Sequence, residues 1–280
     1  FESYAPNAKK IIVNIDNDQL KNLNVKFDLK INADLRGFTY YLEKRPFKKI
    51  LWPNLSKYKK LNWYEFKQSN NINSYEFIRN ISIKEKSKTC YIVDGGGTAL
   101  YAGFQSLNLK KNDRIICSSS ISAMGTGLAE SIGASTTSKF NKYYCIIGDG
   151  SFLMNVQDLQ TIKQLKINLK IIVINNNGYL AIRNTQNEFL KGKLYGTHPK
   201  WNLTLPGIKK IANAFDLTYI RVRSRNKLDF YLDKIIKTPG PLVAELIIDE
   251  NQPSLFKQKF LENSDGTFTP QSLSDMDINQ

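Results

Sequence analysis

Two turns rich in glycine carry the oxygen donors that stand out in this sequence. Asp149 lies between two glycines directly after the apolar run 143–147, and Asn176 follows the apolar run 170–174. A carboxylate, a side-chain amide oxygen and a backbone carbonyl such as that of Gly178 are hard oxygen ligands. Such ligands suit Mg²⁺, which also takes phosphate oxygens. The pattern therefore predicts a site for Mg²⁺ and a diphosphate group.

The spacing of the two turns supports this prediction more than either turn alone. Gly-Asp-Gly and Asn-Gly are common turn sequences, so each is a weak signal by itself. The residues between Asp149 and Asn176 suffice for one helix and one strand. In an open parallel sheet the ligand crevice lies outside the carboxyl ends of the strands, so both turns are expected at one edge. Gly150 and Ser151 open the intervening helix, whose first amides would favour an anion.

Short apolar runs alternate with amphipathic stretches along most of the chain. The runs expected to form strands are rich in Ile and Val and span 10–15, 89–93, 114–117, 143–147, 170–174, 218–222 and 242–248. The stretches expected to form helices span 98–107, 124–138, 152–165, 206–215 and 226–236. This alternation predicts an α/β fold with a doubly wound, mostly parallel sheet and helices on both faces.

Composition narrows the range of possible partners. The net charge of +15 invites a nucleic-acid interpretation, but only eight of the 40 basic residues are arginine and the lysines are spread along the chain. We therefore expect a generic basic surface and no nucleic-acid partner. No apolar run is long enough to cross a membrane. Cys90, Cys117 and Cys145 lie in separate apolar runs, which is typical of reduced thiols in a cytoplasmic protein.

Other phosphate-binding motifs are absent from the sequence. It contains no Gly-x-x-x-x-Gly-Lys-Ser/Thr loop, and Gly125-Thr126-Gly127 has no third glycine in register for a dinucleotide fingerprint.

Several runs resemble thiamine diphosphate-dependent enzymes of the acetolactate synthase-like branch. Gly148-Asp149-Gly150 with Asn175-Asn176 downstream looks like the thiamine diphosphate signature. The supporting runs are YAPNAKKIIVNID, SISAMGTGLAESIGA, GDGSFLMNVQDLQTI and DGTFTPQSLSDM. The resemblance covers nearly the whole chain, but only the C-terminal half of such an enzyme. It implies that 1–44 ends a Rossmann-like central domain and that 74–250 is the diphosphate-binding domain. The stretch 45–73, with two prolines and many Lys and Asn residues, is expected to be a linker, and the polar end 251–280 is expected to be a tail.

The resemblance also implies roles for individual residues. Asp149, Asn176 and the carbonyl of Gly178 would hold Mg²⁺, and Gly150 and Ser151 would bind the diphosphate. On the other side of the cofactor the expected contacts are Gly96, Gly97, Ser122 and Met124. Of these, the two glycines would approach the diphosphate and the other two would meet the aminopyrimidine through backbone carbonyls. Met124 would also be the apolar wedge that bends the cofactor.

The activity implied by the resemblance is decarboxylation of a 2-oxo acid followed by addition to a carbonyl acceptor, with the cofactor as electron sink. The partners would be these small molecules and further copies of the chain, in a homodimer or homotetramer with the active site at the subunit interface. The resemblance assigns no catalytic residue to this chain, because the activating glutamate belongs to a missing domain, and it leaves FAD undecided. Glu130, the acid nearest the pyrimidine motif, is expected to be structural. The chain alone is expected to be inactive.

Some positions depart from the family pattern. Gly97 and Thr98 stand where acetolactate synthases carry glutamine and histidine, Ala129 replaces a usual proline, and Thr185 aligns with a bulky tryptophan of the second-substrate pocket. These departures favour a different acceptor, such as a sugar or an aldehyde. A non-oxidative 2-oxo acid decarboxylase and a non-catalytic cofactor-binding subunit are the alternatives.

Two further side chains have both a functional and a structural interpretation. Arg183 could bind a substrate carboxylate with its planar fork or lie on a solvated helix face. His198, the only histidine, could shuttle protons, but its loop position favours a structural role.

Overall fold

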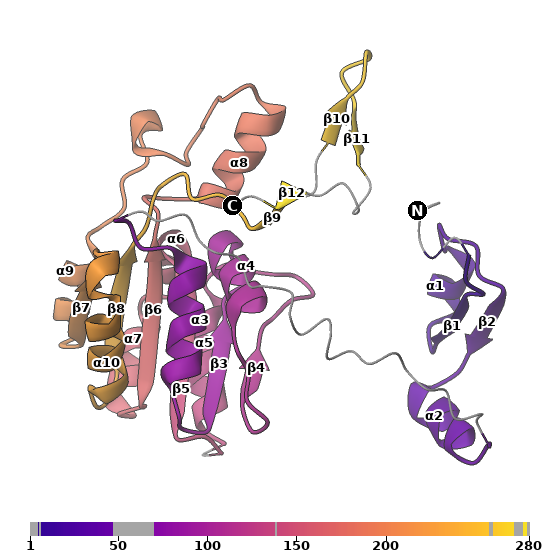
Figure 1. The fold of residues 1–280 in the computed structure, drawn as a ribbon, viewed down its shortest axis with the longest axis horizontal. Coiled ribbons are helices and arrows are strands. Elements are labelled where there is room, and N and C mark those ends of the chain that lie inside the picture. Colours follow the sequence, from indigo (N-terminus) through magenta and orange to yellow (C-terminus); the bar gives the residue numbers. More distant parts are fainter. Residues whose placement is uncertain are drawn as a thin grey trace. The chain divides into compact units, whose positions relative to one another are not determined.

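The computed structural model describes residues 5, 7–46, 70–137, 139–257, 260–271 and 277–278 (Figure 1). The chain divides into two compact units, one of 1–64 with 257–277 and one of 65–256 with 278–280. The predicted linker 45–73 lies mostly outside the described residues, and the predicted domain boundaries stay predictions.

The smaller unit contains a β-α-β-α segment and a hairpin. The segment consists of β1 (Ile11–Asn14), α1 (Asn17–Lys21), β2 (Leu29–Asn32) and α2 (Leu35–Glu43), and its two strands are parallel. Asp16 and Asp34 cap the two helices by accepting hydrogen bonds from backbone amides in the first turn. The antiparallel hairpin consists of β10 (Phe260–Glu262) and β11 (Phe268–Pro270). Two further short strands, β9 (Phe256–Lys257) and β12 (Asp277–Ile278), each have one residue in the smaller unit and one in the larger.

The larger unit is built on a sheet of six strands. They are β3 (Thr89–Val93), β4 (Arg114–Ile116), β5 (Lys142–Gly148), β6 (Leu169–Asn175), β7 (Thr218–Val222) and β8 (Leu242–Ile247). Their order is β4-β3-β5-β6-β8-β7, and every neighbouring pair is parallel. The predicted α/β fold with a parallel sheet is confirmed.

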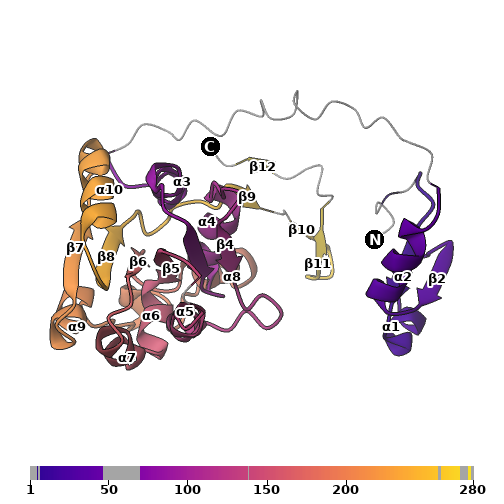
Figure 2. The same cartoon turned by 90° about the horizontal axis from the view of Figure 1, so that it is seen from below.

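Helices cover both faces of this sheet (Figure 2). One layer consists of α3 (Ser74–Lys84), α4 (Gly97–Ser106) and α10 (Leu228–Lys237), and the opposite layer of α5 (Thr126–Ser135), α7 (Asp158–Gln164) and α9 (Ile208–Ala214). The central strands β5 and β6 are buried almost throughout, which explains why their sequences are apolar on both faces. The main core cluster includes Ile147 and Val173 from these strands and Leu128 and Leu159 from α5 and α7.

Helices α1 and α2 of the smaller unit were not predicted, and in the larger unit two helices were not predicted and one predicted helix is divided. Neither α3 nor α8 (Leu180–Phe189) was expected from the sequence. The predicted helix 152–165 is two helices, α6 (Asp149–Met154) and α7, separated by a turn. The side-chain amide of Asn155 in this turn donates to the carbonyl of Gly125 at 2.9 Å. This contact ties the turn to the start of α5.

The start and the end of the larger unit are joined to each other. Ile72 forms a parallel bridge with Ile248. The amide of Ser74 donates to Gln252 Oε1 at 2.9 Å, and Gln252 Nε2 donates to Ser74 Oγ at 2.7 Å. Helix α3 is anchored in this way to the segment that follows β8.

The strand order places a topological switch point between β3 and β5. The chain goes from β3 to β4 on one side and then to β5 on the other, so the connections diverge at this point. In doubly wound sheets a crevice opens there, outside the carboxyl ends of the strands. The turns after β3 and β5 meet at this crevice, and the turn after β6 lies beside them.

Within the described ranges, every helix is too short or too polar to cross a membrane. The three cysteines are free. Cys90 and Cys145 are buried, and Cys117 is partly exposed.

Candidate functional site

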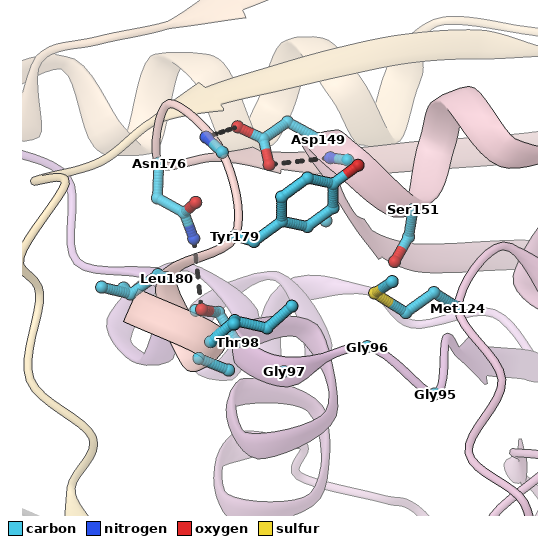
Figure 3. A pocket seen from close by; sticks show the side chains of 15 residues that line it. Gly95, Gly96, Gly97, Thr98, Met124, Asp149, Ser151, Asn176, Tyr179 and Leu180 are labelled. Atoms are coloured by element: carbon cyan, nitrogen blue, oxygen red, sulfur yellow. Dashed lines mark hydrogen bonds between the residues drawn. The ribbon is translucent and has the colours of Figure 1, made fainter. Parts of the chain in front are cut away.

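A cavity of about 120 Å³ lies at the switch point. Its walls come from four segments of the chain, which are residues 95–98 after β3, Met124 before α5, 148–151 after β5, and residues 176 and 178–182 after β6. Figure 3 shows Asp149 and Asn176 on one side of this space and Gly95, Gly96 and Gly97 on the other. The two turns predicted to share an edge of the sheet therefore line one cavity.

Asp149 is the acidic residue of the cavity wall, and it is almost fully buried at 2% exposure. Its Oδ1 accepts from the amide of Gly150 at 2.8 Å, and its Oδ2 accepts from the amide of Gly178 at 2.9 Å. Burial raises the pKa of Asp149 to about 6, although these hydrogen bonds and the charge of Arg183 oppose the rise. A bound cation would favour the ionised form further.

Asn176 offers a buried oxygen to which no described residue donates a hydrogen bond. Its side-chain nitrogen donates to Thr98 Oγ1 at 3.2 Å, as Figure 3 shows. Its Oδ1 has no hydrogen-bond partner among the described residues. Buried polar atoms are nearly always paired, so an orphaned amide oxygen beside a buried carboxylate is a fitting place for a cation.

Close approaches at two glycines shape the part of the cavity predicted to hold the diphosphate. A Cβ on Gly96 would lie 2.5 Å from Ser151 Oγ, and a Cβ on Gly150 would lie 2.2 Å from the ring of Tyr179. Any larger residue at either position would displace its neighbour. The amide of Gly150, one of the helix amides expected to favour an anion, donates to Asp149 Oδ1 in this structure. Ser151 is buried and faces Gly96 across the space.

The remaining predicted cofactor contacts lie around the same cavity. Gly97 has a φ of +38° and begins α4, and a Cβ there would lie 2.7 Å from Ala181 Cβ. Met124 lines the cavity. Ser122 is not in the wall itself, but its carbonyl oxygen lies 2.7 Å from the position of a Cβ on Gly95. The structure thus brings Ser122 and Met124 to the glycine turn after β3.

Asp94 is a structural member of the site that the sequence reasoning missed. It is fully buried, and it accepts from the amides of Gly125 at 2.9 Å and Gly127 at 3.0 Å through Oδ1, and from Gly96 at 3.1 Å through Oδ2. One carboxylate therefore joins the glycine turn after β3 to the start of α5. The available signal was an acid placed directly between a buried strand and three glycines.

The two predicted substrate residues lie outside the cavity wall. Thr185 is exposed on α8, one turn after Ala181, whose carbonyl accepts from its hydroxyl at 3.2 Å. Arg183 is 2% exposed, and its guanidinium donates to backbone carbonyls. This arrangement favours a role inside the protein over a contact with a substrate carboxylate.

His198 and Glu130 also lie outside the wall of this cavity. His198 is buried at the start of a short 3-10 helix, where its Nδ1 accepts from the amide of Lys200 at 3.1 Å. Burial raises the pKa of Glu130. Both placements are in line with the structural roles expected for them.

The donor set of the cavity is chemically distinct from a transition-metal site. In the part of the chain that the structure describes, no group of three His, Cys, Asp or Glu residues could hold a metal ion. One carboxylate, one amide oxygen and one carbonyl would leave places for phosphate oxygens and water, which fits Mg²⁺.

Comparison with known proteins gives the same picture. Residues 94–246 match the family model "Thiamine pyrophosphate enzyme, C-terminal TPP binding domain". The acetolactate synthase large subunit of Porphyra purpurea is 34% identical over 142 residues, which are 51% of this chain and 24% of that protein. The mitochondrial acetolactate synthase catalytic subunit of Aspergillus candidus is 32% identical over 64% of this chain and 25% of that protein. The acetolactate synthase isozyme 2 large subunit of Escherichia coli is 28% identical over 62% of this chain and 31% of that protein.

The aligned region spans about a quarter to a third of the length of these relatives. The family model, in contrast, covers more than half of this chain and includes Asp94, Asp149, Asn176 and the whole segment between them. The chain therefore belongs to the thiamine pyrophosphate enzymes, of which it carries the C-terminal cofactor-binding domain.

Proposed function

We propose that this chain takes part in a carboligation of 2-oxo acids that depends on thiamine diphosphate and Mg²⁺. A 2-oxo acid such as pyruvate would lose carbon dioxide, and the remaining fragment would add to a carbonyl acceptor. The observation that carries the proposal is that the buried Asp149 carboxylate and the Asn176 Oδ1, which has no hydrogen-bond partner among the described residues, line the same cavity of a cofactor-binding domain. The similarity to acetolactate synthases supports the choice of reaction.

The residues of the cavity would divide the work of holding the cofactor. Asp149, Asn176 and the Gly178 carbonyl would bind Mg²⁺, while Gly96, Gly97, Gly150 and Ser151 would border the diphosphate. Ser122 and Met124 would border the aminopyrimidine. When bound, thiamine diphosphate supplies a carbanion and an electron sink, and this chain's residues would position it and keep water away from it.

A complete active site would need a carboxyl group beyond the one that the described residues supply to this cavity. Asp149 is the acidic side chain of its wall, and it is committed to the Gly150 and Gly178 amides. We propose that the activating glutamate comes from a segment outside these 280 residues, so that the chain alone does not turn over pyruvate. Carbon dioxide release above the cofactor-only background by residues 1–280 would contradict this part of the proposal.

Exposed apolar side chains on segments that border the cavity support a subunit interface there. Ile121 is 86% exposed in the loop before α5, and Met154 and Ile182 are each more than 40% exposed beside the cavity. Exposed apolar groups that cluster around a site are typical of surfaces that bind another protein. A homodimer or homotetramer with the active site at the interface would cover them. Two of the similar proteins have names that place them in mitochondria.

The proposal is tested by titrating the complete protein with thiamine diphosphate in the presence and absence of Mg²⁺. We expect Asp149→Asn, which keeps the shape of the side chain, to weaken Mg²⁺-dependent binding by about 100-fold, while Asp158→Asn in the nearby helix α7 has little effect. Binding by Asp149→Asn as tight as in the unmodified protein would overturn the assignment. Product analysis with and without an aldehyde acceptor would separate a carboligase from a decarboxylase, and failure to form either product would favour a non-catalytic subunit.

A further inference from the structure

Arg183 is among the largest fully buried side chains of the larger unit, and both terminal nitrogens of its guanidinium donate to main-chain oxygens, while its Nε has no hydrogen-bond partner among the described residues. Its Nη2 donates to the carbonyls of Asn176 at 2.8 Å and Glu250 at 2.7 Å. Its Nη1 donates to the carbonyls of Thr197 at 2.9 Å and Asn177 at 3.3 Å. None of these four acceptors is a carboxylate. The planar fork therefore joins three separate segments of the chain.

Two of the four acceptors belong to the turn after β6 that would hold the cation. The carbonyl of Asn175, at the start of this turn, accepts from the amide of Ile248 at 3.1 Å. The carbonyls of Asn176 and Asn177 accept from Arg183. Each of the three carbonyls before Gly178 is thus held toward a donor of the protein. The carbonyl of Gly178 is the next one in the turn, and it is the one assigned to the cation.

The surroundings of Gly178 show how closely the turn is held. Gly178 has a φ of +126°, a conformation that favours glycine. A Cβ at this position would lie 2.6 Å from Leu203 Cδ2, 2.7 Å from the carbonyl oxygen of Thr197 and 3.2 Å from Arg183 Nη1. The guanidinium and the Thr197 carbonyl that it binds therefore form the wall against which the turn packs.

We propose that Arg183 is a positioning residue that fixes the turn 175–178 so that Asn176 Oδ1 and the Gly178 carbonyl are presented to the cation. This inference rests on the proposed function. It gives Arg183 no contact with the substrate. A lysine at this position could replace the charge, but its single ammonium group could not reach carbonyls of three segments with the geometry of a planar fork.

Gln186 provides a matched control on the same helix. Like Arg183 it is buried in α8, and it holds the loop after the helix, because its Nε2 donates to the carbonyl of Tyr195 at 3.0 Å and its Oε1 accepts from Thr197 Oγ1 at 2.6 Å. It makes no hydrogen bond to the turn 175–178 among the contacts of the described residues. Gln186→Leu therefore removes a buried polar partner of the loop after α8 but keeps every hydrogen bond that Arg183 makes to the carbonyls of the turn.

The test measures the Mg²⁺ concentration that half-saturates thiamine diphosphate binding in the complete protein, together with the midpoint of thermal unfolding without ligands. We expect Arg183→Lys and Arg183→Met to raise the half-saturating Mg²⁺ concentration by about tenfold or more, as losses of groups that orient metal ligands do. We expect Gln186→Leu to lower the unfolding midpoint but to change the half-saturating concentration by less than about twofold.

Three results would overturn the inference. The first is an unchanged Mg²⁺ dependence in a folded Arg183→Lys variant. The second is a raised KM for the 2-oxo acid with unchanged Mg²⁺ dependence, which would indicate that Arg183 contacts the substrate. The third is loss of folding in both Arg183 variants, which would make the residue a requirement of the whole fold. If the unmodified protein binds no thiamine diphosphate with Mg²⁺, the proposed function itself fails, and this result is distinct from the other three.

Discussion

Thr98 and Asn176 come from different sides of the cavity, and the hydroxyl of the first accepts a hydrogen bond from the side-chain amide of the second at 3.2 Å. Thr98 lies at the start of α4, where the acetolactate synthase pattern has histidine, and Asn176 follows β6. Because the amide nitrogen is directed to Thr98, the amide oxygen is the atom left for the cavity. A residue that departs from the family pattern thus orients a predicted metal ligand.

Removing the Thr98 hydroxyl should weaken the cation site. Thr98→Val keeps the shape of the side chain but takes away the acceptor, so the Asn176 amide would be free to rotate. We expect the half-saturating Mg²⁺ concentration to rise by about tenfold, whereas Thr98→Ser keeps the hydroxyl and should stay close to the unmodified protein. Equal Mg²⁺ dependence in the Val and Ser variants would show that this hydrogen bond does not orient the ligand.

Asp94 should matter both for the fold and for the cofactor. Asp94→Asn replaces one acceptor oxygen by an amino group, so at least one of the amides of Gly96, Gly125 and Gly127 would lose its partner. We expect a loss of about 2–3 kcal/mol in the free energy of unfolding and weaker binding of thiamine diphosphate. Both are measured on the same protein, by urea unfolding and by calorimetry.

The matched control for this change is Asp113→Asn. Asp113 also accepts from two backbone amides, those of Thr89 at 3.1 Å and Lys110 at 3.0 Å, but it lies before β4, at the opposite end of the sheet from the cavity. The Asp113→Asn variant should be less stable than the unmodified protein but should bind the cofactor with the same affinity. Unaltered cofactor affinity in Asp94→Asn would show that Asp94 stabilises the fold but does not affect cofactor binding.

Thr185 allows a test of the acceptor pocket. We predict that the complete enzyme accepts an acceptor larger than a second pyruvate and that Thr185→Trp narrows the accepted range, with discrimination changing by roughly 10–200-fold. Thr185→Val, which adds no bulk, is the control. Competition between a small and a large aldehyde measures the effect. Since Thr185 is exposed and outside the cavity wall, an unchanged acceptor profile in the Trp variant would place it away from the acceptor in the assembled enzyme as well.

Glu85 should make stability depend on pH in the acidic range. It is 1% exposed, and its Oε2 accepts from Lys142 Nζ at 2.9 Å and from the hydroxyl of Tyr144 at 2.8 Å. Burial acts to raise the pKa of Glu85, but these contacts and the amide of Ser87 lower it to about 2. Because the folded-state pKa is below the ordinary value of 4.5, the stabilisation is present above that pH and is lost as the pH falls toward 2.

We therefore expect Glu85→Gln to lower the free energy of unfolding by roughly 3 kcal/mol at pH 7, with the difference from the unmodified protein disappearing near pH 2. Asp229→Asn is the control, because the ion pair of Asp229 with Lys84 is exposed and such pairs contribute little. Urea unfolding between pH 2 and pH 7 measures both. A difference that stays constant over this range would mean that the charge of Glu85 is not what stabilises the fold.

The sheet was predictable because its strands are short apolar runs whose side chains are buried on both faces. Helix α8 was not predictable, because its buried positions include the polar Arg183 and Gln186. These side chains bind main-chain carbonyls, and the helix therefore lacks a continuous apolar face in its sequence. The break between α6 and α7, where Asn155 contacts the carbonyl of Gly125, 30 positions away, was also not predictable from local sequence.

Some residues of the candidate site were predictable from local sequence, and others depend on contacts made only in the folded chain. Asp149 and Asn176 could be found from residue type and spacing, because strand ends in a parallel sheet meet at one edge. The role of Asp94 depends on three amides that come together only in the folded chain, two of them about thirty positions away. The interpretation of Arg183 required its burial and its acceptors, and neither is a property of local sequence.

The hydrogen bonds between Ser74 and Gln252 define where this cofactor-binding domain must begin and end if it is to be moved into another protein. A piece cut to the segment 94–246 that matches the family model would lack α3, whose Tyr75, Phe77 and Ile78 are buried, and it would lack Glu250, whose carbonyl binds Arg183. Transplanting or exchanging the domain between related enzymes should therefore succeed only with crossover points before Ile72 and after Gln252. A recombination point at the edges of sequence similarity would separate the turn 175–178 from Ile248 and Glu250, which help to hold it.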